Sequence, residues 1–318
     1  MNFKLLLLFM SLILFVFSSS LLAQENASII NDIMSEYQKN NDLITSAIVE
    51  YTIDQRFTPE GQKGYEYYVL DPNTATQPKK NWALGGMLPF HKEYTFKLDQ
   101  NRKYEKVLNI PHADSIFKPS ERYLSSNGIE TISYNSGSKS ASRVPYKQHG
   151  GEITGPINFI NFGRIITKYG NVGTNNISPE LTDIRFIDSA IIEGKEYYWV
   201  EGKVKYESND FPILLRALLD PSKGYVAKRI EKIDTANKDG IPYSLTLDFL
   251  NYRLVPVGNG NNLWVADTII LKDSYAPTLS GKIASIVEQE IKLKDIQLNV
   301  PIQSSEMIIE LPDGVEIY

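Results

Sequence analysis

The stretch LLDPSKGYVAKRIE, residues 218–231, predicts two extended segments joined by a tight turn. Asp220-Pro221 suits the opening of a turn, because proline fixes φ near the value that a turn requires. Gly224 can supply a positive φ, which residues with a side chain rarely adopt. Aromatic, aliphatic and charged residues then follow in an extended run. The stretch therefore predicts a β-hairpin, and it raises the question of what kind of sheet contains it.

Apolar and polar residues alternate with a period of two on both sides of this hairpin. Tyr94, Phe96 and Leu98 show the alternation cleanly, and it is typical of strands with one buried face. After Phe249 the apolar phase shifts to Leu250, which predicts a bulge or a strong bend. Extended segments are expected at 46–57, 64–70, 94–98, 102–108, 121–126, 129–134, 183–192, 196–206, 212–219, 225–233, 243–254, 263–271 and 285–300.

Two segments favour helix instead. In residues 28–41 the apolar positions fall on one helical face, with Ser28 as a plausible N-cap. Residues 156–169 predict a short helix that begins at Pro156. The segment 135–154, rich in serine, glycine and lysine, is expected to be a loop. Strands at short spacing with one clear helix predict an antiparallel meander with a helix packed on one side.

The N-terminus has the pattern of a secretory signal peptide. Lys4 precedes an apolar run from Leu5 to Phe17, which is short for a membrane-spanning helix. We expect cleavage after Ala23, with Ser20 as the alternative site, and export to the periplasm; an uncleaved anchor is the competing interpretation. Because the chain has no cysteine, neither a lipid anchor on a cleavage-site cysteine nor a disulfide is expected. The net charge of −5 argues against a nucleic-acid partner.

No sequence motif indicates catalysis or metal binding. His91, His112 and His149 lie near proline or glycine in expected loops, without the short spacing of metal ligands. Residues 235–246 resemble a calcium loop faintly, but threonine occupies the first and last ligand positions. There is no nucleophile elbow, phosphate-binding glycine loop or cysteine nucleophile. We therefore expect no metal, no cofactor and no enzyme activity, although spacing alone leaves a catalytic pair of carboxylates open.

Two apolar stretches without a regular period are the candidate ligand-binding segments. One covers residues 82–90, where Gly85-Gly86 can act as a hinge between bulky apolar residues. The other lies in the expected helix 156–169. They either pack permanently as core or line and cover an apolar cavity, because a monomer seldom leaves such a patch exposed without a use. The candidate ligand-binding residues are Trp82, Leu84, Met87, Leu88, Phe90, Phe159, Ile160 and Phe162.

Several short motifs, taken in order, resemble the LolA-like family of exported lipoprotein-sorting proteins, and its larger branch most closely. Residues 29–49 resemble the family's opening helix and first strand, and 219–231 resemble its central hairpin. Residues 123–132 resemble a further hairpin, while 299–302 and 309–315 resemble the family's ending. Each motif consists mainly of residues that are common in turns, so the resemblance depends on the order in which the motifs occur. The chain is longer than the compact carrier and lacks a match for the arginine that helps hold the carrier's lid shut.

The resemblance implies an α+β fold: an antiparallel sheet curled into an incomplete half-barrel, with an N-terminal helix and short covering helices. One domain over 24–318 is expected after a signal peptide at 1–23, with insertions near 71–92 and 109–120. The implied function is a monomeric periplasmic carrier or binding protein for lipoprotein acyl chains or another amphiphile, with an envelope protein as a further expected partner. The alternatives are an interaction module without a small ligand, contacting partners through exposed tyrosines, and an enzyme acting on envelope polymers.

Overall fold

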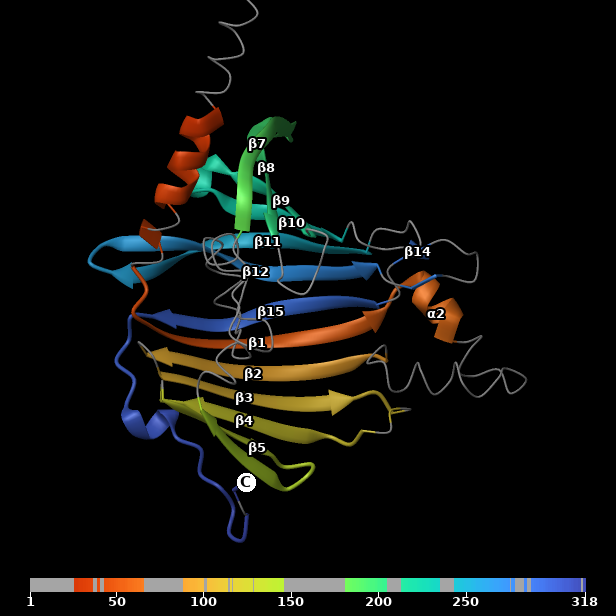
Figure 1. Cartoon of the computed structure of the whole chain (residues 1–318), viewed down its shortest axis with the longest axis vertical. Coiled ribbons are helices and arrows are strands. Elements are labelled where there is room, and N and C mark those ends of the chain that lie inside the picture. The colour runs from red at the N-terminus through yellow and green to blue at the C-terminus, as the bar shows by residue number, and fades with distance from the viewer. Residues whose placement is uncertain are drawn as a thin grey trace, which may run out of the picture.

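Thirteen strands of the computed structural model join one antiparallel sheet, which Figure 1 shows face on. The described residues are 26–36, 39–40, 43–65, 88–99, 102–113, 115, 117–127, 129–145, 181–204, 213–234, 243–274, 276–277, 283–284, 287–315 and 317–318. The strands of this sheet are β1 Ser46–Phe57, β2 Phe90–Asp99, β3 Arg102–Pro111, β4 Ser120–Ser126, β5 Glu130–Asn135, β6 Ser140–Pro145, β7 Leu181–Ile192, β8 Lys195–Val204, β9 Ile213–Asp220, β10 Val226–Asp234, β11 Tyr243–Gly258, β12 Asn261–Ser274 and β15 Val287–Leu298. The short strands β13 (Ala276–Pro277) and β14 (Ile283–Ala284) pair separately.

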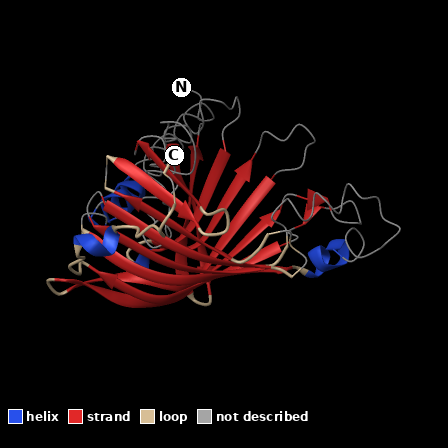
Figure 2. Cartoon of the chain, turned by 90° about the horizontal axis from the view of Figure 1, so that it is seen from below, coloured by secondary structure: helices blue, strands red, loops and turns tan. Residues whose placement is uncertain are grey.

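The strand order is that of two meanders that meet in the middle of the sheet. It runs β6-β5-β4-β3-β2-β1-β15-β12-β11-β10-β9-β8-β7. Strand β15 pairs with β1 on one side and with β12 on the other, and so joins the meander β1–β6 to the meander β7–β12. Figure 2 shows that the sheet is strongly curved while its two edges stand apart. The predicted antiparallel meander is confirmed, and the sheet is open rather than closed into a barrel.

Helices are few in the described part of the chain, so the fold is mostly β rather than the expected α+β. The predicted N-terminal helix is confirmed over residues 26–36, and its Ile33 is buried in the main apolar cluster. The others are α2 (Pro59–Tyr65) and the 3₁₀ turns η2 (Pro221–Lys223) and η3 (Ser304–Met307). The expected helix 156–169 lies outside the described residues. None of the described helices is long and apolar enough to span a membrane.

The hairpin of residues 218–231 forms as the sequence predicts. Strands β9 and β10 flank η2, and Oδ1 of Asp220 accepts hydrogen bonds from Ser222, at 3.0 Å from the backbone nitrogen and 2.6 Å from the hydroxyl. The backbone N–H of Tyr225 donates to the Asp220 carbonyl at 2.9 Å. Gly224 takes the left-handed conformation, with φ 69°. A Cβ placed on Gly224 would lie 3.4 Å from Oε1 of Glu36, so the turn also lies against the N-terminal helix.

Two local expectations are wrong. The strand expected from Gly64 does not begin there, because residues 59–65 form α2. Pro59 stands at its first position, and the Thr58 hydroxyl accepts a hydrogen bond of 3.1 Å from the backbone of Gly61, which is the chemistry that starts a helix. The loop expected at 135–154 contains β6, which pairs with β5 and joins it through a turn at 136–139.

The apolar phase shift after Phe249 does not move the buried side of β11. Leu250 and Leu254 are exposed, whereas Val255 is buried in the main apolar cluster. Asn251 takes a left-handed φ of 55°, but the ladder with β12 keeps its register through this point. The bulge in that ladder follows Pro256, nearer the turn. The ladder therefore has no bulge where the phase shift predicted one, and Leu250 and Leu254 face solvent.

Candidate functional site

The pleat of β1 to β4 sends alternate side chains to two faces of different chemistry. On one of them Tyr51 lies directly opposite Tyr94, and their rings stack with centroids 4.4 Å apart and an interplanar angle of 11°. Val49 lies opposite Phe96 beside them, and all four residues belong to or pack against the main buried cluster. We call this the apolar face and define it on these strands by Val49, Tyr51, Ile53, Phe90, Lys92, Tyr94, Phe96, Glu105, Val107, Arg122 and Leu124.

A buried ion pair interrupts the apolar face. Glu105 on β3 lies opposite Phe96 of β2 and opposite Leu124 of β4, between apolar neighbours. Its side chain is 5% exposed and accepts a hydrogen bond of 2.8 Å from Nη2 of Arg122, whose own side chain is 47% exposed. A buried carboxylate needs such a partner, because an unpaired charge is costly to remove from water. The pair therefore connects the apolar interior to an exposed positive rim.

Lys92 adds a second positive charge to the apolar face. It stands between Phe90 and Tyr94 on alternate positions of β2, and its Nζ lies 4.3 Å from the centroid of the Phe90 ring. In the part of the chain that the structure describes, this half-buried ammonium makes no ion pair or hydrogen bond. Burial, followed by repulsion from Arg122, lowers the pKa of Lys92, although Glu105 acts in the opposite direction. Arg122 thus pairs with Glu105, whereas Lys92 interacts with that carboxylate only from a distance.

The stacked tyrosines keep their phenolic protons. Burial raises the pKa of Tyr94 to about 12, with Glu105 as a smaller cause in the same direction. Burial also raises the pKa of Tyr51 well above its ordinary value. Both phenols are therefore neutral in physiological conditions and available as hydrogen-bond donors beside the two cations.

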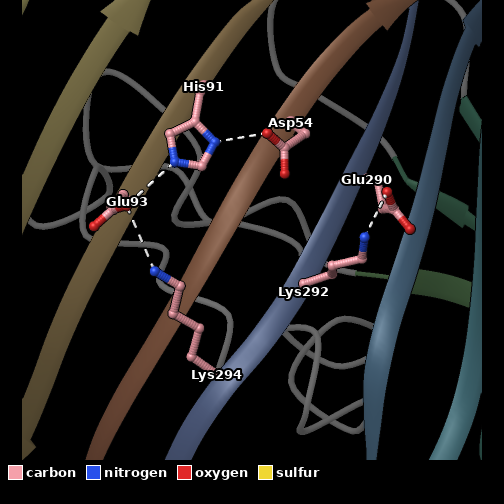
Figure 3. A network of polar contacts seen from close by, with 6 residues as sticks. All are labelled: Asp54, His91, Glu93, Glu290, Lys292 and Lys294. Carbon is pink, nitrogen blue, oxygen red and sulfur yellow. Dashed lines mark hydrogen bonds and ion pairs between the residues drawn. The ribbon is translucent and has the colours of Figure 1, made fainter.

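The opposite face of the same strands is charged, and Figure 3 shows one of its networks. Nδ1 of His91 lies 2.6 Å from Oδ1 of Asp54, and its Nε2 lies 3.3 Å from Oε1 of Glu93. Glu93 also meets Lys294 at 3.5 Å. His91 therefore lies within β2, not in a loop as expected. We call this the charged face and define it by Asp54, Arg56, His91, Glu93, Lys106, Glu121, Glu288, Glu290 and Lys292.

The ion pairs of the charged face lie at the solvent-exposed surface of the sheet. Most of their side chains are partly exposed, and an exposed ion pair contributes only about 0–1 kcal/mol to stability. The hydrogen bond with Asp54 raises the pKa of His91, and the bond with His91 lowers the pKa of Glu93. Among the described residues, no group of three or more histidine, aspartate and glutamate side chains could hold a metal ion.

Two of the eight predicted ligand-binding residues lie among the described ones. Leu88 is buried, and its carbonyl accepts a hydrogen bond of 2.8 Å from Nε2 of Gln55. Phe90 begins β2 on the apolar face, beside Lys92. The other six, Trp82, Leu84, Met87, Phe159, Ile160 and Phe162, lie outside the described residues, as do His149 and residues 235–242 of the calcium-like segment 235–246, whose last four residues begin β11. The structure therefore brings Phe90 to a site whose other members are new.

The charged members of this site escaped the sequence analysis, although a signal was present. The alternation of Tyr94, Phe96 and Leu98 continues backwards to Lys92 and Phe90, so one strand face can be read from the sequence. Glu105 lies on β3 and Arg122 on β4, and no local sequence pattern indicates that these two residues meet. Only the ladders of β3 with β2 and with β4 bring them together.

A separate pocket of about 280 Å³ lies between the segment 304–309 and strands β3 to β5. Arg102 in its wall donates a 2.6 Å hydrogen bond to the Ser304 hydroxyl and pairs with Asp99. The Ser125 hydroxyl donates to the carbonyl of Met307. Because these polar groups bond one another, the pocket is a seam where the C-terminal segment packs on the sheet, and it gives no independent sign of a ligand.

Comparisons with models of protein families and with curated proteins find no match to this sequence. Among solved structures, the fold is similar to the crystal structure of a proposed outer membrane lipoprotein-sorting protein domain from Vibrio parahaemolyticus, with a TM-score of 0.46 and 11% identity, covering 86% of this chain and 95% of that one. It is also similar to a DUF1329 family protein from Desulfovibrio piger, with a TM-score of 0.47 and 8% identity, covering 87% and 95%. The chain is thus structurally similar to these two proteins, at low sequence identity.

Proposed function

We propose that the chain is an exported binding or carrier protein that holds an amphiphile against the apolar face. The observation that supports this is that two cations lie among the apolar side chains of that face. Half-buried Lys92 is directly opposite half-buried Ile53 and next to Tyr94 on alternate positions of β2, and Arg122 is partly exposed in the row of Tyr51 and Tyr94. An amphiphile likewise joins an apolar part to a polar or charged part. Its apolar surface would leave water with a gain of roughly 25 cal/mol per Å².

A lipidated protein is the first ligand to test, because the motifs quoted from the sequence resemble those of the LolA-like family. A carrier must also release its cargo, so moderate affinity is expected. Mass spectrometry of the native protein, purified from its own envelope without detergent, should reveal a co-purified amphiphile. The protein should also bind the neutral apolar dye N-phenyl-1-naphthylamine saturably. The proposal is refuted if no amphiphile co-purifies with the protein and the dye does not bind saturably.

A matched pair of variants tests whether the apolar face is the binding surface. Ile53 and Ile48 are both half-buried on β1, but Ile53 packs against the main cluster on the apolar face and Ile48 points to the other side. Ile53→Gln should weaken dye binding several-fold, because it places an amide where an apolar ligand lies, while Ile48→Gln should not. Urea melts of both variants check that they lose similar stability. Equal effects on binding would place the ligand elsewhere.

A second candidate function is an interaction module, and the edge of the sheet at β7 favours it. Ile191 on this end strand is 79% exposed, and Ile187 is 44% exposed. An exposed edge with apolar side chains can accept a strand from a partner protein. If Ile191→Lys abolishes capture of an envelope protein while the dye is not bound by any form of the chain, this function replaces the first.

A further inference from the structure

We propose that Lys92 and Arg122 recognise the anionic headgroup of the bound amphiphile, a carboxylate or a phosphate. This inference rests on the proposed function, and it names the chemical class of the ligand and the residues that select it. Both side chains belong to the apolar face, and both lie on the same sides of their strands as the stacked pair Tyr51 and Tyr94.

The neighbours of Lys92 on the apolar face are side chains that the apolar part of such a ligand could contact. Phe90 and Tyr94 flank it on alternate positions of β2 and are half-buried, whereas Phe96 and Leu98 further along the strand are buried. An acyl chain in contact with the half-buried Phe90 or Tyr94 would bring its headgroup to Lys92. Across the sheet, Arg122 reaches the same region from β4, where it holds Glu105.

The charges at this place do not balance within the described residues. Arg122 uses Nη2 to hold Glu105 at 2.8 Å, and a guanidinium has further N–H donors in the same plane. Among the described residues Lys92 has no carboxylate partner, and its ammonium lies over the Phe90 ring instead. A half-buried ammonium without a counter-ion opposes folding, so its position suggests a use other than stability.

A second buried carboxylate of this sheet, Glu201, has both of its neighbouring cations bound to it and serves as a structural comparison. Glu201 on β8 is buried, and each of its oxygens accepts a hydrogen bond of 2.6 Å, one from Arg185 and one from Arg216. These bonds outweigh burial and leave the pKa of Glu201 lowered. There the buried carboxylate meets both cations directly. Near Glu105, Lys92 forms no ion pair with any residue that the structure describes, and a ligand anion would supply its partner.

The inference narrows the choice of amphiphile. A neutral acyl anchor would leave Lys92 as it is in the free protein, whereas an anionic headgroup would gain a charge-assisted hydrogen bond in a partly dehydrated site. We therefore expect dodecanoate and lauroyl lysophosphatidate to bind more tightly than neutral monolauroylglycerol of the same chain length. Tighter binding of dodecanoate would indicate a fatty acid as the ligand, and tighter binding of lauroyl lysophosphatidate would indicate a phospholipid.

The test uses displacement of N-phenyl-1-naphthylamine from the full chain by these three ligands. Lys92→Met keeps an unbranched side chain one atom shorter and removes its charge, and it should weaken the binding of both anions at least roughly tenfold while leaving that of monolauroylglycerol unchanged. Lys92→Arg should restore most of the preference. Lys106→Met is the matched control, because Lys106 lies on the neighbouring strand β3 but on the charged face, where it pairs with Glu121.

The outcomes separate this inference from the proposed function. If dye binding is retained in Lys92→Met, the variant is folded and its apolar face is intact. If wild-type protein binds all three ligands equally, or if Lys92→Met and Lys106→Met behave alike, the headgroup inference is overturned while amphiphile binding stands. If no ligand displaces the dye and no dye binds to the wild-type protein, the proposed function itself fails.

Discussion

Gly224 shows two independent constraints on one residue. Its φ of 69° lies in the left-handed region, and a Cβ there would approach Glu36 of the N-terminal helix to 3.4 Å. Gly224→Val should therefore destabilise the protein by about 1–3 kcal/mol, measured by urea unfolding. Gly194→Val is the control, because Gly194 has a φ of 76° with nothing near its Cβ position, so that it reports backbone strain alone.

The comparison of the two glycine variants distinguishes strain from contact. If Gly224→Val costs clearly more stability than Gly194→Val, the turn also positions the N-terminal helix. If both cost the same, the contact with Glu36 contributes little. In either case the hairpin is structural, so the folded variants should still bind the apolar dye as the wild-type protein does. Loss of dye binding without loss of stability would contradict this assignment.

At the scale of elements, His91 links β1 to β2 across the charged face. The hydrogen bond with Asp54 raises the folded-state pKa of His91 above its ordinary 6.5. Protonated His91 therefore stabilises the fold fully below about pH 6.5, and the contribution is lost as the pH rises through the raised pKa. His91→Gln should lower the melting temperature more at about pH 5.5 than at about pH 8.5.

A double-mutant cycle with Asp54→Asn checks the cause of this pH dependence. Without the carboxylate, the largest contribution to the raised pKa of His91 disappears. The effect of His91→Gln should then depend much less on pH than it does in the wild-type background. An unchanged pH dependence in the Asp54→Asn background would show that Asp54 is not the partner that matters in solution.

What the sequence could reveal differs between elements for a physical reason. The β9–β10 hairpin and the face of β2 follow from local rules, turn chemistry and alternation, and both were predicted. Helix α2 was missed because its signal, Thr58 before Pro59, competes with a run of aromatic residues further on. The site's ion pair was missed because Glu105 and Arg122 meet only through strand pairing, which no local pattern encodes.

For the whole molecule, an open sheet leaves two edges that could pair with other chains. At β6 the backbone of Tyr318 donates to the carbonyl of Ala141 at 3.2 Å and its carbonyl accepts from Arg143 at 2.9 Å. Deleting residues 315–318 should uncover this edge and cause concentration-dependent self-association, measured by light scattering after size exclusion. Tyr318→Ala keeps the backbone bonds and should behave as the full chain does. If the truncated chain stays monomeric at every concentration tested, the edge at β6 does not self-associate when residues 315–318 are absent.

The position of β15 has a consequence for how the molecule is assembled in time. Ala47 pairs with Leu298, so β1 finds its second neighbour only when nearly the whole chain is present. Each meander can form from contacts close in sequence, but their union waits for one late strand, and closure over such a separation is slow. Until β15 arrives, β1 and β12 each have an unpaired inner edge, so a partly synthesised chain is open to pairing with other chains at two places.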